Sequence, residues 1–217
     1  MVKILNKENT ILNKFIAQMR DKSIQRDAMR FRRNMERVAE IMAYEISKKL
    51  NYATRMVETP LGIAAVEEIS DKVVVATILR AGLPFHQGFL NYFDDAENAF
   101  VSAYRSYSSE SEFEIKVEYI ACPSLEGKTL ILCDPMLASG ASMVAAYEVL
   151  CKHGGKPAHT HMVSVLGCTE GVDFVLQHTN PAEVDLWVAT VDPVLNPHKY
   201  IVPGLGDAGD LCFGEKL

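Results

Sequence analysis

This sequence of 217 residues lacks a long apolar run and any C-x-x-C pair. No stretch approaches the roughly 20 apolar residues that a membrane-spanning helix requires. The first 20 residues contain no apolar run long enough for a signal peptide. The five cysteines are scattered and odd in number, a pattern typical of reduced thiols in a cytoplasmic protein. We therefore expect a cytoplasmic protein that has no membrane partner.

The sequence also has fewer basic than acidic residues. The chain has 22 Lys and Arg against 28 Asp and Glu, which gives a formal net charge of −6. Non-specific nucleic-acid binding depends on an excess of basic residues, so we expect no nucleic-acid partner. The hydrophobic fraction of 48% with 23% charged residues is ordinary for a globular enzyme and argues against disorder. Positive charge for any phosphorylated ligand must therefore be local.

The most informative segment is residues 134–142, which we call the phosphate loop. A strand-like run at residues 129–133 leads directly into it, and a helix-period stretch follows at residues 143–150. Free backbone N–H groups at a helix N-terminus, together with the helix dipole of about half a charge, bind anions. Gly140 and its short neighbours allow a phosphate to approach the main chain. Asp134 suits hydroxyls or a metal on the same ligand, so the pattern predicts a phosphorylated sugar.

The rest of the chain alternates between strand-like and helix-like runs after a helical part at about residues 1–50. This order predicts an α/β fold with a largely parallel sheet flanked by helices, and ligands in such sheets bind beyond the carboxyl ends of the strands. No repeat or linker interrupts the chain, so we expect one domain, residues 1–217. Strands are expected at residues 73–79, 99–104, 113–119, 129–133, 159–166 and 184–190, and further helices at 82–92, 143–153 and 171–178.

Two segments depart from this alternation. Residues 105–112 are polar, lie between two strand-like runs and have nothing to bury, which makes them a candidate mobile flap over a site. Residues 200–210, which we call the base loop, contain three glycines and two carboxylates. Chain ends are usually frayed and polar, whereas this segment has the composition of a shaped loop.

Four segments together resemble the uracil phosphoribosyltransferases, over about residues 19–216. The phosphate loop combined with a Pro-Gly-Leu-Gly-Asp-Ala-Gly-Asp sequence is far more specific than a glycine-rich loop alone. The resemblance implies a type I phosphoribosyltransferase fold with a small C-terminal base-binding loop region. It also implies a pentosyltransferase that converts uracil and 5-phospho-α-D-ribose 1-diphosphate into UMP and diphosphate with Mg²⁺. The four segments are residues 78–83, 104–105, 134–142 and 200–210, the last followed by Phe213 and Gly214.

The resemblance further implies roles for matched residues. Asp134, Arg105 and Asp207 are the implied catalytic residues, with Asp134 on the ribose hydroxyls and Asp207 near the ribosyl substrate. Arg80 and Arg105 would bind the diphosphate, because a guanidinium group stays charged and contacts phosphate oxygens in pairs. Uracil would be bound by Ile201, Gly206, Asp207 and Ala208, and the phosphoribosyl group also by Pro135, Met136, Leu137, Ala138, Ser139, Gly140, Ala141 and Ser142.

Two departures from the family pattern lie in the phosphate loop, and the first, Ser139 in place of threonine, keeps the hydroxyl group. Ala141 stands where the family usually has glycine, which is acceptable if this residue has a negative φ at the start of a helix. The family also implies a homo-oligomer and a possible GTP effector. Seven basic residues within residues 20–37 favour a solvated helix face, with a subunit contact or an effector-phosphate site as alternatives.

Other functions stay open on the sequence alone. A phosphoribosyltransferase for another base, a uridine-nucleotide sensor without turnover and an RNA-binding pyrimidine regulator are the alternatives, because a fold does not prove catalysis. His159 and His161 share one face of a strand and could bind a metal. No third ligand is near them in the sequence, so ordinary surface or packing histidines are the expected interpretation.

Overall fold

The computed structural model describes residues 1–107 and 113–216, and for residues 103–107 and 113–117 it describes the backbone alone. Within these residues the central sheet has eight strands. They are β1 (Val2–Ile4), β4 (Val73–Leu79), β5 (Glu97–Tyr107), β6 (Phe113–Ala121), β7 (Thr129–Cys133), β8 (Met136–Leu137), β9 (His159–Cys168) and β10 (Val184–Asp192). Their order is β1-β10-β9-β7-β4-β5-β6, with β8 beside β9, and every pairing is parallel except that of β5 with β6.

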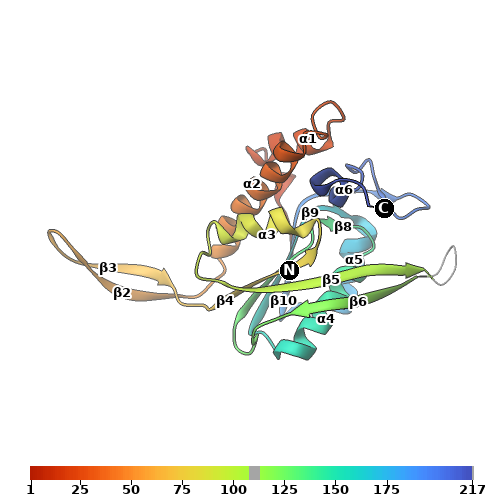
Figure 1. Cartoon of the computed structure of the whole chain (residues 1–217). Helices are drawn as coiled ribbons and strands as arrows, with labels where there is room; N and C mark the ends of the chain where they lie inside the picture. The colour runs from red at the N-terminus through yellow and green to blue at the C-terminus, as the bar shows by residue number, and fades with distance from the viewer. Residues whose placement is uncertain (108–112, 217) are drawn as a thin grey trace.

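Helices cover both faces of this sheet (Figure 1). Two separate clusters of buried apolar side chains lie between the sheet and the helices, one on each face. The first cluster includes α1 (Leu12–Arg20), α2 (Ala28–Ser47), α3 (Gly82–Leu90) and the short α6 (Ala208–Phe213). The second includes α4 (Ala141–Gly154) and α5 (Thr169–His178). A single 3₁₀ turn, Leu5–Lys7, follows β1 in the described chain.

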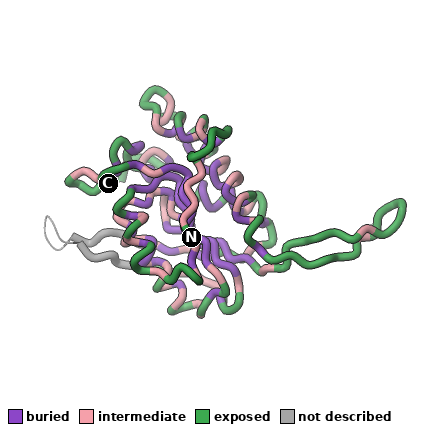
Figure 2. The backbone as a smooth tube through the Cα atoms, turned by 180° about the vertical axis from the view of Figure 1, so that it is seen from behind, coloured by how far each residue is buried: buried purple, intermediate pink, exposed green. Residues whose placement is uncertain are grey.

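Strand β4 illustrates why the sequence folds this way. Its side chains alternate between the two clusters, with Val75 in the first and Val74 and Ala76 in the second. All three are fully buried. A strand that is covered on both faces needs a continuous apolar run, which is the pattern of a central parallel strand. Figure 2 shows the buried backbone concentrated in these central strands.

The predicted strands and helices are all present, and two of them, β4 and β7, have the predicted bounds. The sequence analysis missed β1 before the N-terminal helices. It also missed the hairpin formed by β2 (Tyr52–Thr59) and β3 (Gly62–Ile69), which we call the arm. The arm extends away from the body of the protein and its residues are exposed or only partly covered (Figures 1 and 2). Period-based prediction fails here because neither face of the arm is buried.

The segment predicted as a flap falls partly on β5. The backbone of Arg105 pairs with Ile115 on β6, so the polar segment begins inside a strand. Residues 108–112, the remainder of the predicted flap, lie outside the described residues. Among the helices in the described part of the chain, none is long and apolar enough to cross a membrane.

Candidate active site

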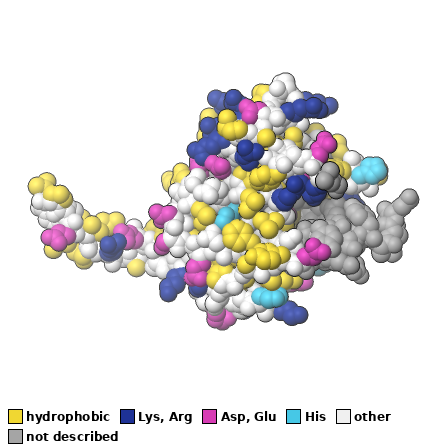
Figure 3. Space-filling view, viewed as in Figure 1, with side chains coloured by type: hydrophobic (Ala, Val, Ile, Leu, Met, Phe, Trp, Pro, Cys, Tyr) yellow, Lys and Arg dark blue, Asp and Glu magenta, His cyan; other side chains and the backbone are white. Residues whose placement is uncertain are grey.

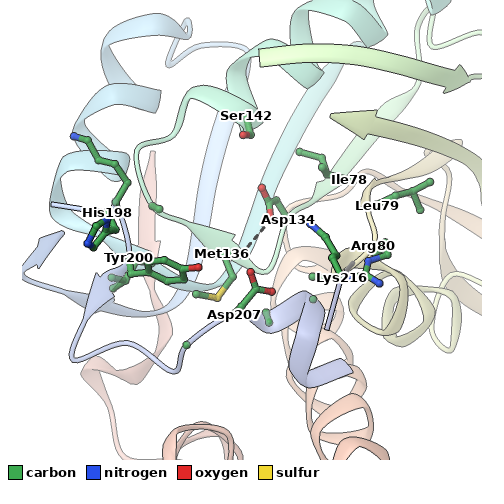
Figure 4. Close-up of a pocket in the computed structure, with 17 residues that line it drawn as sticks. Ile78, Leu79, Arg80, Asp134, Met136, Ser142, His198, Tyr200, Asp207 and Lys216 are labelled. Atoms are coloured by element: carbon green, nitrogen blue, oxygen red, sulfur yellow. Dashed lines mark hydrogen bonds between the residues drawn. The ribbon is translucent and has the colours of Figure 1, made fainter. Parts of the chain in front are cut away.

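A cleft of about 600 Å³ opens at the carboxyl ends of β4 and β7, where the sequence analysis expects a ligand. The base loop forms one wall of this cleft and the residues that follow β4 form another (Figure 4). The end of β4, the phosphate loop and the C-terminal residues are distant in the sequence, and all three line this cleft. The cleft is lined by Ile78, Leu79, Arg80, Ala81, Asp134, Met136, Ala138, Ser142, His198, Lys199, Tyr200, Ile201, Gly206, Asp207, Ala208, Gly209 and Lys216.

The phosphate loop connects β7 to the N-terminus of α4. Gly140 precedes the helix with φ +81°, a left-handed conformation that favours glycine, and no side chain caps the first turn. Ala141 begins the helix with a negative φ, which is the condition for accepting alanine where the family usually has glycine. A small hollow within the loop is lined by Asp134, Met136, Leu137, Ala138, Ser139, Gly140, Ser142 and Met143. Helix dipole and backbone N–H groups here provide an anion site.

Helix α5 supports the phosphate loop from behind. A Cβ added at Gly171 would lie 2.3 Å from the carbonyl oxygen of Ala138, and one added at Gly140 would lie 2.8 Å from the carbonyl oxygen of Gly171. Both glycines are therefore needed for the close approach of α5 to the loop. This packing constrains the conformation of the phosphate loop.

Asp134 lies at the floor of the cleft (Figure 4). Its backbone N–H donates to the carbonyl oxygen of Val163 at 3.1 Å, which continues the β7–β9 pairing by one residue. Its Oδ1 accepts a hydrogen bond from the backbone N–H of Met136 at 3.2 Å. The carboxylate is thus oriented by the turn that begins the phosphate loop.

Arg80, which follows β4, and Asp207, which precedes α6, both line the cleft (Figure 4). The Arg80 Nη2 lies 3.3 Å from Asp210 Oδ1 and 3.5 Å from the carbonyl oxygen of Gly214. The Arg80 side chain is 39% exposed, so a ligand can reach it. Asp207 caps α6 by accepting from the backbone N–H of Asp210 at 2.9 Å.

The adjoining cysteines are not nucleophiles. Burial raises the pKa of the Cys133 thiol well above its ordinary value, and the Asp134 carboxylate adds to the effect. Burial likewise raises the pKa of Cys212 to about 12. Both thiols are protonated at neutral pH, and a protonated thiol is a weak nucleophile. Neither thiol is therefore a candidate nucleophile for the cleft.

Most of the predicted site residues come together here. Pro135 and Ala141 lie in the phosphate loop but line neither hollow, and the side chain of Arg105 lies outside the described residues. The sequence analysis missed Tyr200, which lines the cleft (Figure 4), and it gave no role to His198, which also lines it. It also missed Lys199, Gly209 and Lys216.

Comparisons with known proteins agree with this geometry. The family model described as "Uracil phosphoribosyltransferase" matches residues 6–215. The chain belongs to the uracil phosphoribosyltransferase family. The parallel sheet with its phosphate loop and C-terminal base loop is accordingly a type I phosphoribosyltransferase fold.

Individual relatives match this chain over nearly its whole length. A uracil phosphoribosyltransferase of Porphyromonas gingivalis is 55% identical over 213 residues and covers 98% of both chains. One from Methanothermobacter thermautotrophicus is 39% identical, over 96% of this chain and 94% of its own. The solved structure of the AQ2163 protein from Aquifex aeolicus has a TM-score of 0.86 at 28% identity, covering 99% of this chain and 98% of its own.

The paired histidines, His159 and His161, lie at the amino end of β9, away from the cleft at the carboxyl ends of the strands. Asp185 of β10 supplies the third possible ligand that the sequence analysis did not find. Its Oδ2 lies 3.2 Å from His159 Nε2, and its Oδ1 is paired with the Met1 ammonium group at 2.9 Å. The Nδ1 atom of His161 accepts a hydrogen bond from Trp187 Nε1 at 3.2 Å. These three residues thus form a polar network with each other, Trp187 and the chain's ammonium group.

Proposed function

We propose that this protein transfers the phosphoribosyl group of 5-phospho-α-D-ribose 1-diphosphate to uracil, which yields UMP and diphosphate. The observation that carries the proposal is the single cleft in which the phosphate loop, Arg80 and the base loop meet. Family membership supports the same reaction. The experiment is nucleotide formation, followed by chromatography, with uracil, cytosine, orotate, hypoxanthine and adenine offered in turn. UMP from uracil alone supports the proposal, and the nucleotide of another base contradicts it.

Different residues of the cleft bind different groups of the substrate. The phosphate loop binds the 5-phosphate through backbone N–H groups, and the Asp134 carboxylate accepts hydrogen bonds from the ribose hydroxyls. Arg80 contacts the leaving diphosphate. Because negative charge increases on that group as the C1–O bond breaks, a fixed cation there stabilises the transition state more than the ground state. Alignment of uracil N1 with C1 supplies much of the remaining acceleration.

The base loop accounts for the choice of uracil. Ile201 and Ala208 are buried and anchor the loop, whereas Gly206 and Asp207 are exposed at the cleft. The loop can therefore offer main-chain groups to a ligand while its buried residues hold it in place. Backbone donors and acceptors can pair with O2, N3–H and O4 of uracil. Cytosine would place its 4-amino group against a donor, and a buried polar group without a partner is strongly disfavoured.

Mg²⁺ fits the donor chemistry of the cleft. The carboxylates of Asp134 and Asp207 both line it, and Mg²⁺ prefers oxygen ligands, commonly one or two carboxylates together with substrate phosphates. These two residues would hold the ion beside the diphosphate. When bound, Mg²⁺ neutralises charge on the diphosphate and helps to orient it. Arg80 provides the protein's own positive charge at the same position.

A homo-oligomer is supported by the arm. The register of β2 and β3 places four exposed apolar residues, Tyr52, Met56, Ile63 and Ile69, on one face of the arm, where they alternate with Thr54, Glu58 and Glu67. Figure 3 shows apolar side chains along this extension. A two-stranded hairpin is only marginally stable alone, and apolar patches of this kind are typical of contact surfaces. We propose that this face packs against a second copy of the chain.

Sedimentation velocity tests this assembly. Ile63→Arg replaces an exposed apolar side chain of this face with a charged one and should shift the protein toward the monomer. Val66→Arg is the matched control, since Val66 lies on the opposite face of the arm. A monomeric unmodified protein, or an Ile63→Arg variant of unchanged size, would contradict the proposed contact.

Cytoplasmic residence and a GTP effector remain predictions. The five cysteines are free thiols, which supports a reducing compartment. For GTP, the seven basic residues of residues 20–37 give limited support, because five of them have polar partners within the chain: Arg20, Arg30, Arg32, Arg33 and Arg37. Rates of UMP formation with and without GTP test the effector.

A further inference from the structure

Arg20 and Asp192 form an ion pair between residues 172 positions apart in the sequence. Arg20 is the last residue of α1, and Asp192 is the last residue of β10. Arg20 Nη1 lies 2.7 Å from Asp192 Oδ2, and Arg20 Nη2 lies 2.7 Å from Asp192 Oδ1. This is the paired geometry in which a guanidinium group binds a carboxylate most strongly. The Asp192 side chain is only 8% exposed, so the pair is shielded from water.

The same ion pair holds one residue of the base loop. Gly204 donates its backbone N–H to Asp192 Oδ2 at 2.8 Å, and its carbonyl oxygen accepts from Arg20 Nη1 at 3.0 Å. Gly204 is buried and has φ +62°. A Cβ at this position would lie 2.0 Å from the carbonyl oxygen of Ile201, so the loop folds tightly on itself here. Both polar backbone groups of Gly204 therefore depend on this ion pair.

Neighbouring contacts extend this support along the loop. Gln25 Nε2 donates to the carbonyl oxygens of Met19 and Leu205, at 2.8 and 3.0 Å. Arg32 Nη1 donates to the carbonyl oxygen of Cys212 at 2.6 Å. Basic and polar side chains of the N-terminal helical part thus bind main-chain groups both in the base loop and within α6. The interpretation of residues 20–37 as a solvated helix face is wrong for Arg20 and Arg32.

We propose that Arg20 and Asp192 are positioning residues that set the base loop in its uracil-binding conformation. The inference rests on the proposed function. Gly204 lies between Ile201 and Gly206, which are two of the residues expected to contact uracil. A displacement of Gly204 moves both of them, and small displacements of a substrate-positioning group cost much of the rate. Asp207 of the base loop also lies near the diphosphate substrate, but that substrate is bound mainly by Arg80 and by the phosphate loop between β7 and α4. The pair contacts neither of these in the hydrogen bonds given above, so we expect binding of the diphosphate substrate to be affected less than binding of uracil.

The state of Asp192 agrees with this role. Burial by itself would raise the pKa of Asp192, but hydrogen bonds from Arg20 and from the Gly204 N–H outweigh burial and lower that pKa. The carboxylate is therefore charged at neutral pH. Removing Arg20 leaves a buried carboxylate without its cation, and removing the Asp192 charge leaves the Gly204 N–H with a weaker acceptor.

The test compares Arg20→Lys, Asp192→Asn and the double variant with the unmodified protein. Lysine keeps the charge but cannot bridge both carboxylate oxygens and the Gly204 carbonyl. Arg33→Met is the matched control, because Arg33 belongs to the same basic segment and pairs with Glu36 on the helix surface. Three quantities are measured: KM for uracil, KM for the diphosphate substrate, and the hydrogen-exchange rates of backbone amides in residues 200–208.

We expect Arg20→Lys and Asp192→Asn each to raise KM for uracil about tenfold or more, with KM for the diphosphate substrate within about twofold. Amide exchange in residues 200–208 should accelerate in both, and the double variant should be no worse than the more affected single variant. Equal changes in both KM values, or unchanged uracil KM and amide exchange, would overturn the inference.

The design separates this inference from the proposed reaction. If the unmodified protein forms no UMP, the reaction is refuted, and amide exchange then decides whether the pair holds the loop. If Asp192→Asn does not fold, Arg20→Lys alone decides, because it preserves the charge of the pair. Arg33→Met should match the unmodified protein in all three quantities.

Discussion

Gly140→Ala tests whether the phosphate loop depends on its close contact with α5. The new methyl group would lie 2.8 Å from the carbonyl oxygen of Gly171 and 3.1 Å from the Phe174 ring. Alanine at φ +81° costs about 1 kcal/mol or slightly more, because its Cβ is crowded in the left-handed region. Relieving the contact with backbone atoms adds about 1–3 kcal/mol, as overpacking does elsewhere. We expect unfolding free energy to fall by about 2–4 kcal/mol.

Gly127→Ala provides a matched control for this prediction. Gly127 has φ +69°, and a Cβ added there would have no heavy atom of the described chain within 4 Å, so alanine meets the left-handed cost alone. Both substitutions restrict the unfolded chain equally, so that contribution cancels in the comparison. The difference between the two variants isolates the contact with α5.

Urea unfolding and steady-state kinetics give the two readouts. Gly140→Ala should also raise KM for the diphosphate substrate about tenfold or more, because the loop must move away from Gly171, while KM for uracil changes little. Gly127→Ala should change neither KM. Equal destabilisation by the two variants, or equal effects of Gly140→Ala on both substrates, would refute the reasoning.

Two further predictions concern Asp134 and His161. Asp134→Asn should lower kcat/KM by about a hundredfold or more while unfolding free energy changes by less than about 1 kcal/mol, and near-normal turnover would remove Asp134 from the site. Burial is the main cause that lowers the pKa of His161 from its ordinary 6.5 to about 4. Between these values only the unfolded chain takes up the proton, so stability falls as pH drops from about 6.5 to about 4, by at most about 3 kcal/mol. Trp187, the single tryptophan, donates to His161, and its fluorescence reports urea unfolding at each pH. His161→Gln should lessen this pH dependence, and an unchanged slope would contradict the assignment.

The sheet could be predicted from the sequence because its strands are buried on both faces. The apolar runs of β4 and β7 are continuous and too short for a typical buried helix, and turn residues mark their ends, so they favour buried strands. The arm could not be predicted in this way. Its apolar residues, such as Met56 and Ile63, are exposed, so their positions follow no burial pattern within one chain.

In the site as well, residues within local motifs could be predicted, whereas residues placed by contacts between distant segments could not. Local motifs predicted Asp134 and Asp207, because each lies within a short segment whose residues act together. Tyr200 was missed since its place follows from a turn in which Asn196 bonds both backbone groups of Tyr200, at 2.9 and 2.8 Å. Arg20 and Asp192 are 172 positions apart in the sequence, and no local pattern encodes a contact between residues so far apart.

The most direct test of the central claim is the yield of UMP and diphosphate from uracil and 5-phospho-α-D-ribose 1-diphosphate with Mg²⁺. Both products should form in equal amounts with the unmodified protein, and neither should form at a comparable rate with Asp134→Asn. Diphosphate release without UMP, or no turnover while UMP still binds, would contradict the account and favour hydrolysis or a nucleotide sensor.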